Sequence, residues 1–562
     1  MRRKWPWILV GLVVALGLGG TLLLGGTGRL FREAVELVAR GGEKELRDPM
    51  RPARGGTRIL IFALDGVGED ELRGAIRSGL TPAVARLLGE EGKDGSFEHG
   101  YAVPDVISIL PSTTMAAWSS IFSGEPAGRT GVPGNEWFVR EERRFMAPAP
   151  VSITEHGHTV RMFTDGLVGN ALRVPTLYER ADLRSYVSLA PVYRGADLFT
   201  TPEPTAVAAL FLQAAKGLVD GESVEREAYS EIDQESVVDL IEEINERGVP
   251  DIQVVYFPGI DLFTHVAARP LDQQKLYLGE ILDPLIGKVL DAYQSTGALD
   301  STYILFVADH GHTPVVNDDR HSLSTEGDDE PPALIEHTGF RMRPFVLEPE
   351  EERQDYQATV AYQGAIAYIY LADRSTCPRS GDPCAWERPP RLAEDVMPVV
   401  RAFYEANETG AVVPELRGTL DLIFARSPRA PGEDAVPFEV YDGRRLVPIA
   451  DYLERHPRPD LFRLEERMKG LSAGPYGHRA GDVLLFARSG GRRPIEDRFY
   501  FSGLYHSWHG SPEQQDSRVP LIIARKRSSG DEIKSIVNPV VGASASQLDV
   551  VPVVLRLLEQ RR

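Results

Sequence analysis

Short apolar runs alternate along the chain with segments of helical periodicity. Residues 58–64, 252–257 and 302–307 are nearly continuous apolar runs, the pattern of strands buried on both faces of a parallel sheet. Residues 236–246 carry apolar side chains at helical spacing, and a glycine and a proline separate them from the second run. This alternation predicts an α/β fold with a mainly parallel sheet sandwiched by helices.

The pattern changes between residues 331 and 469, where an acidic cluster, two cysteines and a loop rich in Pro and Arg interrupt it. Apolar strand and helix patterns return near residues 482–486, 519–524 and 547–559. We therefore expect a catalytic core formed by residues 57–330 and 470–562, with residues 331–469 inserted as a cap region.

The N-terminal segment is uncharged from Trp5 to Gly28, and three basic residues lie within positions 1–4. At helical rise this stretch can span the ~30 Å hydrocarbon core of a bilayer. It predicts an N-terminal transmembrane helix with residues 1–4 in the cytoplasm and the remainder exported. The alternative is a signal segment that is cleaved on secretion. Residues 29–56 are polar and form the expected linker to a periplasmic or extracellular catalytic domain.

Composition and charge narrow the possible partners. The 562 residues include 62 Lys and Arg against 82 Asp and Glu, a formal net charge of −20. This balance argues against binding of duplex nucleic acid, whose phosphates attract clustered basic side chains. A small phosphoester remains a possible substrate if metal ions supply positive charge. Cys377 and Cys384 exclude a multi-cysteine zinc site; in an exported protein they could close a disulfide, and otherwise they are unpaired surface thiols.

Three predicted strands end at or near an aspartate, and histidines accompany these carboxylates. Ligands of open α/β sheets bind beyond the carboxyl ends of the strands, and carboxylate with imidazole is the ligand chemistry of zinc and related metals. The candidate ligands are Asp65, Asp261, His265, Asp309, His310 and His509. The spacing assigns no ligand role to four further histidines, His312, His321, His478 and His506. For these a structural role is at least as well supported.

A candidate nucleophile lies in residues 111–118, where a proline and three hydroxyl residues precede an apolar helical segment. A hydroxyl at a helix N-terminus, and any phosphate it attacks, are stabilised by the positive end of the helix dipole. Coordination to a metal would lower the pKa of that hydroxyl. Thr114 is the candidate, and the alternative is that Thr113 or Thr114 only caps the helix.

Together these residues resemble the alkaline phosphatase superfamily, and within it the type I phosphodiesterases and nucleotide pyrophosphatases. The similar motifs, in the family's order, are Asp65-Gly66, Pro111-x-x-Thr114, Asp261-x-x-x-His265, Asp309-His310-Gly311 and His509-Gly510. The resemblance implies two zinc ions, or other divalent metals, in one site. It assigns Asp261, His265 and His509 to the first ion and Asp65, Asp309 and His310 to the second, with Thr114 as the attacking ligand. It also implies that Asn135 holds a phosphoryl oxygen, although an Asn there could simply serve its turn.

The implied activity is hydrolysis of phosphodiester or pyrophosphate bonds through a phosphothreonine intermediate. A phosphomonoesterase with the same metals is one alternative, and a weakly active surface protein that binds phosphate-containing ligands is another. A transferase that uses an acceptor other than water is a third. The segment from Thr114 to Trp118 departs from the Thr-Phe-Pro-Asn-His of well-known members. The expected substrate is a small phosphoester, either a nucleotide or a lipid or glycan phosphodiester.

Overall fold

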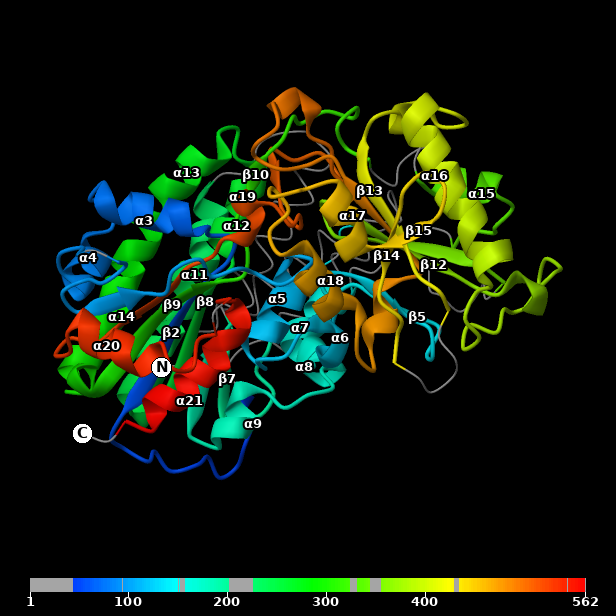
Figure 1. Cartoon of the computed structure of the whole chain (residues 1–562). Helices are drawn as coiled ribbons and strands as arrows, with labels where there is room; N and C mark the ends of the chain where they lie inside the picture. Colours follow the sequence, from blue (N-terminus) through cyan, green and yellow to red (C-terminus); the bar gives the residue numbers. More distant parts are fainter. Residues whose placement is uncertain are drawn as a thin grey trace, which may run out of the picture.

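The computed structural model describes residues 44–92, 94–149, 151, 157–201, 226–323, 331–343, 355–428, 434–542 and 544–560. Two large sheets lie side by side, each with helices packed against it (Figure 1). Among these residues, no helix has both the length and the apolar composition needed to span a bilayer. The expected anchor at residues 5–28, like the first part of the linker, falls outside the described residues.

The first sheet is mostly parallel, as predicted. Its strand order is β1 (Lys44–Glu45), β7 (Leu198–Thr200), β6 (Ser185–Ser188), β8 (Ile252–Phe257), β2 (Arg58–Leu64), β9 (Thr302–Ala308), β18 (Leu521–Ala524) and β3 (Gly100–Ala102). The run from β7 to β9 is parallel, whereas β1, β18 and β3 join antiparallel. The register pairs Leu64 with both Phe257 and Ala308, so the carboxyl ends of β8, β2 and β9 meet at one edge.

Alternate residues of the central strands face two helical layers. Leu60, Phe62 and Leu64 of β2 face one layer, whereas Ile59 and Ile61 face the other. The first layer contains α3 (Glu69–Arg77), α4 (Pro82–Leu88), α11 (Arg226–Arg247), α12 (Gly259–Val266), α13 (Pro270–Tyr277) and α14 (Asp283–Ser295). The second contains α5 (Thr114–Ile121), α8 (Leu167–Ala171), α9 (Leu177–Ala181), α20 (Gly530–Val537) and α21 (Val550–Leu558). This is the predicted arrangement of helices on both faces.

The second sheet is antiparallel throughout. Its order is β11 (Ala358–Tyr362), β12 (Ile366–Leu371), β16 (Val483–Ala487), β13 (Leu420–Ala425), β14 (Glu439–Tyr441) and β15 (Leu446–Pro448). Helices α16 (Met397–Thr409) and α18 (Leu464–Ser472) pack against its two faces. The expectation that residues 482–486 return to the main core is wrong, because β16 lies inside the second sheet, beyond the expected end of the insertion at residue 469. Cys377 and Cys384 form a disulfide beside this sheet.

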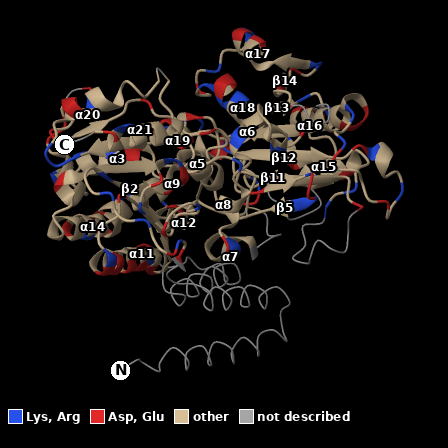
Figure 2. Ribbon diagram, turned by 90° about the horizontal axis from the view of Figure 1, so that it is seen from below, with Lys and Arg blue, Asp and Glu red and all other residues tan. Residues whose placement is uncertain are grey.

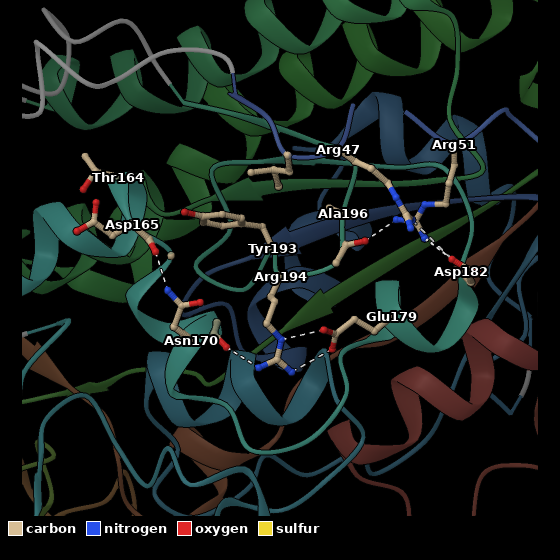
Figure 3. Close-up of a pocket in the computed structure, with 14 residues that line it drawn as sticks. Arg47, Arg51, Thr164, Asp165, Asn170, Glu179, Asp182, Tyr193, Arg194 and Ala196 are labelled. Carbon is tan, nitrogen blue, oxygen red and sulfur yellow. Dashed lines mark hydrogen bonds and ion pairs between the residues drawn. The ribbon is translucent and has the colours of Figure 1, made fainter. Parts of the chain in front are cut away.

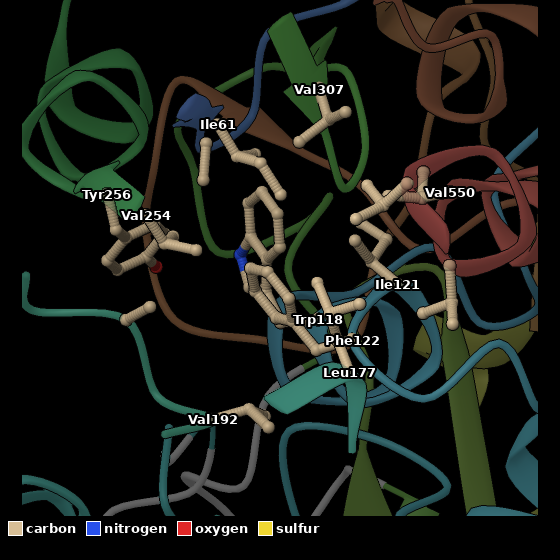
Figure 4. Packing of buried hydrophobic residues seen from close by; sticks show 14 of the residues in the cluster. Ile61, Trp118, Ile121, Phe122, Leu177, Val192, Val254, Tyr256, Val307 and Val550 are labelled. Carbon is tan, nitrogen blue, oxygen red and sulfur yellow. The ribbon is translucent and has the colours of Figure 1, made fainter. Parts of the chain in front are cut away.

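Helix α5 lies between the two sheets and therefore occupies a central position. Trp118 is fully buried against the first sheet, where it stacks on Phe122 and meets the ring of Tyr256 edge-on at 5.4 Å (Figure 4). Ala116 and Ala117 instead pack into the core of the second sheet. Since both sides of α5 are held by packed cores, the position of its first residue, Thr114, is fixed by the whole fold.

Helix α4 shows how a buried carboxylate can replace a local cap. Thr81 occupies the N-cap position, as predicted, but its side chain makes no capping hydrogen bond. The carboxylate of Asp283 instead accepts hydrogen bonds from the amides of Ala83 (2.9 Å) and Val84 (3.0 Å). The orphan N–H groups of a helix start are thus satisfied from a neighbouring helix.

Candidate metal centre

Two neighbouring parallel strands place Asp65 and Asp309 side by side. Asp65 directly follows β2, Asp309 directly follows β9, and both carboxylates are buried. Asp309 Oδ1 accepts hydrogen bonds from the amides of Gly66 and His310, both at 3.0 Å. The hydroxyl of Tyr256 donates to Asp65 Oδ2. These bonds orient both carboxylates while leaving one oxygen of each without a hydrogen bond.

Helix α12 supplies the next two side chains just beyond the end of β8. Asp261 and His265 are four residues apart and therefore share one face of the helix, with Asp261 Oδ2 3.5 Å from His265 Nε2. His265 Nδ1 donates to the carbonyl of Ser507 at 2.7 Å. That bond assigns the proton to Nδ1 and leaves Nε2 as the ligand atom.

His310 and His509 complete the cluster from two further segments. His310 Nε2 lies 3.2 Å from Asp309 Oδ2, 3.6 Å from Asp65 Oδ1 and 4.0 Å from Asp261 Oδ1. His509 follows the short strand β17 (Ser507–Trp508), which pairs with β10 (Thr313–Pro314) just after His310. His509 Nδ1 donates to the carbonyl of Ser112 at 3.0 Å, so its Nε2 is also the free nitrogen.

The six side chains form two groups able to hold metal ions. In each group the potential ligand atoms lie within 4.8 Å of one another: Asp261, His265 and His509 in the first, and Asp65, Asp309 and His310 in the second. These are the two sets that the resemblance implied. The residues fit metal ions, because Asp65 Oδ1 and Asp309 Oδ2 are buried without a hydrogen-bond partner and the histidine Nε2 atoms are unprotonated where Nδ1 donates.

The electrostatics of the cluster favour added positive charge. Burial and the nearby carboxylates of Asp309 and Asp261 raise the pKa of Asp65 well above its ordinary value. Burial likewise raises the pKa of Asp309 to about 7 and lowers the pKa of His310 to about 3. Asp261 differs, since His265 and His312 overcome the effect of burial and hold its pKa low. Burial also lowers the pKa of His509, whereas the Asp261 carboxylate overcomes the effect of burial on His265 and raises the pKa of that ring. A divalent cation would offset the charge of the buried carboxylates.

Thr114 faces this cluster from the start of α5. Its Oγ1 lies 3.3 Å from His310 Nε2, and the residue is 8% exposed. The N-cap residue is Thr113, whose hydroxyl makes no capping hydrogen bond and has no hydrogen-bond partner among the described residues. The structure therefore does not support the alternative in which Thr113 or Thr114 only caps the helix.

Asn135 is held against the same helix terminus. Its Oδ1 accepts a hydrogen bond from the backbone N–H of Met115 at 2.9 Å, and its backbone N–H donates to Gln363 Oε1 at 2.7 Å. Gln363 lies between β11 and β12, so the second sheet helps to position Asn135. Within the described part of the chain, the Nδ2 group of Asn135 makes no hydrogen bond, which leaves it available as a donor next to Thr114.

A sequence comparison now identifies the family. The model of the type I phosphodiesterase / nucleotide pyrophosphatase family matches residues 59–374, more than half of the chain. The chain belongs to this family. Its members are metal-dependent hydrolases that act on phosphoester bonds, so the protein is a phosphoester hydrolase. No curated protein sequence gave a match.

Comparison with solved structures gave more distant matches. An inactive variant of mouse ectonucleotide pyrophosphatase/phosphodiesterase 5 in complex with AMP has a TM-score of 0.48 and 11% identity, over 89% of this chain and 95% of that one. The human enzyme has the same TM-score, 12% identity, and coverage of 89% and 94%. A phosphonoacetate hydrolase from Sinorhizobium meliloti 1021, in complex with phosphonoformate, has a TM-score of 0.45 and 15% identity, over 90% and 99%.

His312 belongs to the site of this phosphoester hydrolase, although its spacing in the sequence gave it no ligand role. Its Nε2 lies 2.8 Å from Asp261 Oδ1, and its Nδ1 lies 3.0 Å from the hydroxyl of Ser507. It also forms a third possible ligand group with Asp261 and His310. The one feature of the sequence that points to a place for His312 in the site is its position two residues after His310 on the same segment. The side chains of His321, His478 and His506 have polar partners outside the cluster.

The protein also has a surface cavity of about 570 Å³, lined by residues such as Arg51, Asp182, Tyr193 and Arg194 (Figure 3). None of the candidate site residues lines it. Its charged side chains already have partners, since Arg194 pairs with Glu179 at 3.0 Å and Arg51 with Asp182 at 3.1 Å. We therefore place the chemistry at the strand ends rather than in this cavity.

Proposed function

We propose that this protein is a zinc-dependent phosphodiesterase that cleaves phosphodiester or pyrophosphate bonds with Thr114 as the nucleophile. One observation carries the proposal: the Thr114 hydroxyl lies 3.3 Å from His310 Nε2, against two groups of buried Asp and His ligands. When bound, two metal ions would lower the pKa of the hydroxyl and balance the charge on phosphoryl oxygens. Asp261, His265 and His509 would hold one, and Asp65, Asp309 and His310 the other.

The protein's own groups then account for the geometry of the reaction. Thr114 Oγ1 attacks phosphorus, the bond from phosphorus to the leaving oxygen breaks, and the alcohol or phosphate departs with a proton. Water then hydrolyses the phosphothreonine and restores the threonine hydroxyl. The start of α5 and the Nδ2 group of Asn135 supply donors for a non-bridging phosphoryl oxygen during both steps.

The histidine tautomers support the same assignment. Hydrogen bonds from Nδ1 to the carbonyls of Ser507, Gly311 and Ser112 are available to His265, His310 and His509 respectively. Each bond turns Nε2 toward the cluster and holds the ring in place, which is the usual arrangement of metal-binding histidines.

The test combines Thr114 variants with trapping of the intermediate. Thr114→Ala should lower turnover by about 10³-fold or more and form no phosphoprotein, while metal content stays at the wild-type value. Thr114→Ser should retain part of the activity and form phosphoserine. Near-normal turnover by Thr114→Ala would remove Thr114 from this role.

A substrate panel on the holoenzyme separates a diesterase from a monoesterase. It should include nucleotide diesters, glycerophosphodiesters and monoesters of the same alcohols. We expect the diesters or pyrophosphates to have the higher kcat/KM, since only contacts beyond the metal ions distinguish the classes. A preference for monoesters with the same metal content would instead favour the phosphomonoesterase alternative.

We further propose that the enzyme is anchored in a membrane, with its catalytic part outside the cytoplasm. The apolar segment from Trp5 to Gly28 and the Cys377–Cys384 disulfide support this location, because disulfides persist in oxidising compartments. Fractionation of cells that make the full chain tests it. Recovery with membranes, together with accessibility to protease added outside, is the expected result, and recovery in the cytosol contradicts it.

A further inference from the structure

Helix α11 has many acidic residues, and two of them, Asp233 and Glu243, are buried. Glu243 forms an ion pair with Arg247 at 2.6 Å. Glu227, Glu231, Glu242 and Glu246 are exposed, and acidic residues along α11 are visible in Figure 2. Asp233 on the same helix is 0% exposed. Burying a carboxylate is costly unless hydrogen bonds or charges compensate, so its partners indicate its role.

The partners of Asp233 belong to the two helices that follow β8. Its Oδ1 accepts a hydrogen bond from the amide of Gly259 at 3.0 Å, and its Oδ2 accepts one from the hydroxyl of Tyr277 at 2.8 Å. Gly259 is the first residue of α12, and Tyr277 is the last of α13. No Lys or Arg of the described residues forms an ion pair with Asp233. These two donors are therefore what holds the carboxylate.

The start of α12 has no cap of its own. Its N-cap residue is Pro258, which has no side chain able to accept a hydrogen bond. The Asp233 carboxylate therefore satisfies the first amide of this helix from a neighbouring one, as Asp283 does for α4. The difference lies in what the two helices carry: α12 carries Asp261 and His265, whereas α4 carries no candidate ligand.

The contact is too close for any residue larger than glycine at position 259. A Cβ there would lie 2.6 Å from both Asp233 Oδ2 and the Tyr277 hydroxyl, and closer still to the carbonyl of Tyr229. The carboxylate thus sits directly against the backbone two residues before Asp261. Moving the first turn of α12 would move Asp261 and, one turn later on the same face, His265.

The far end of α12 is fixed independently. The amide of His506 donates to the carbonyl of His265 at 2.8 Å, and the hydroxyl of Ser507 donates to the carbonyl of Thr264 at 2.9 Å. The Phe263 ring packs on Tyr277 with centroids 5.6 Å apart. With its C-terminal end held by β17, the helix depends on Asp233 and Tyr277 for the position of its N-terminal end.

We propose that Asp233 is a positioning residue for the first metal group: it fixes where α12 begins and thereby the separation of Asp261 and His265 from His509. This inference rests on the proposed metal-dependent function. Residues behind metal ligands typically contribute 10–100-fold to metal affinity. Asp233 would act in this way through the helix backbone, without touching a ligand.

The test measures zinc affinity by chelator competition on the full chain. Asp233→Ala should weaken one of the two zinc sites by about 10–100-fold and leave the other within about threefold of wild type. Tyr277→Phe, which keeps the ring, should give a smaller loss at the same site. Asp233→Asn should restore most of the affinity, because its Oδ1 can accept from Gly259 and its amide can donate to the Tyr277 oxygen.

The matched control is Asp283→Ala, which removes a buried helix-capping carboxylate from α4. It should leave both zinc affinities within about threefold of wild type even if it lowers the melting temperature as much. Equal losses from Asp233→Ala and Asp283→Ala, or no loss from Asp233→Ala, would overturn the inference.

A second readout needs no metal. In the metal-free protein, amide hydrogen exchange of the first turn of α12 should be at least tenfold faster in Asp233→Ala than in Asp283→Ala. If the wild-type protein binds no divalent metal, the proposed function fails. Equal exchange in the two variants would instead overturn the positioning role of Asp233 by itself.

Discussion

The imidazole rings of His310 and His509 are stacked, with centroids 3.6 Å apart and ring planes 13° from parallel. His310 follows a central strand of the first sheet, and His509 follows β17, almost two hundred residues later. The two rings belong to different ligand groups, so their stacking is a direct contact between the two groups. Burial lowers the pKa of both rings, and the neighbouring His310 lowers the pKa of His509 further.

The two groups should be separable by mutation. His509→Ala removes a ligand of the first group, and Asp65→Ala removes one of the second. Because each loss leaves two ligands in the affected group, we expect each variant to retain about one zinc per chain and to lose turnover. Elemental analysis after dialysis measures this. Two zinc ions retained in either variant would mean that the altered residue is not a ligand.

His312 should affect the zinc affinity of the first ligand group through its contact with Asp261. Its Nε2 lies 2.8 Å from Asp261 Oδ1, so it constrains the carboxylate that the first metal would use. His312→Ala should weaken zinc at that group by about 10–100-fold. His321→Ala is the control, since His321 pairs with Asp318 outside the cluster, and it should leave zinc affinity unchanged. Complete loss of one zinc in His312→Ala would indicate that His312 is itself a ligand.

Asn135 should contribute to turnover but not to metal binding. Its Oδ1 is held by the amide of Met115, and its Nδ2 group is the donor left for substrate. Asn135→Ala should lower kcat/KM by about 10²–10³-fold with zinc content unchanged, as expected for a donor to a developing charge. Gln363→Ala removes the side chain that holds the backbone of Asn135 and of Glu136, and it should have a smaller effect. An unchanged kcat/KM in Asn135→Ala would leave Asn135 with a turn-forming role only.

Glu513 should make stability depend on pH. Burial and the nearby Asp516 raise the pKa of Glu513 to about 7, from an ordinary value of 4.5. The folded state therefore holds this proton more tightly than the unfolded chain does. The resulting stability is complete below about pH 4.5 and is lost as the pH rises through about 7.

Glu513→Gln should accordingly stabilise the protein at pH 8 by up to about 3 kcal/mol, and change it little near pH 5. Thermal unfolding at the two pH values measures the difference. The exposed Glu465→Gln serves as the control and should show no such pH-dependent gain. A gain from Glu513→Gln that is equal at both pH values would contradict the assignment.

The sequence revealed the parts of the site that lie at the ends of strands. Asp65 and Asp309 could be predicted because buried parallel strands place their carboxyl ends at one edge. Thr114 could be predicted because a helix start favours a hydroxyl near a phosphate. His265 followed from its i,i+4 relation to Asp261 on one helix face.

Other features depended on contacts that local pattern does not contain. His312 enters the site because β10 pairs with β17, and this pairing joins segments almost two hundred residues apart. A short buried strand has the same apolar pattern in a parallel or an antiparallel sheet, so the pattern of β16 does not show which sheet contains it. Asp233 carried no signal, since a buried acid on a helix with many exposed acids can be recognised only from its partners.

The most direct test of the account is a crystal structure of the zinc-loaded protein with anomalous diffraction measured at the zinc edge. The account predicts two strong anomalous peaks, one enclosed by Asp261, His265 and His509 and the other by Asp65, Asp309 and His310, with the Thr114 hydroxyl facing the second. No peak at these residues, or zinc bound only elsewhere in the fold, would contradict it.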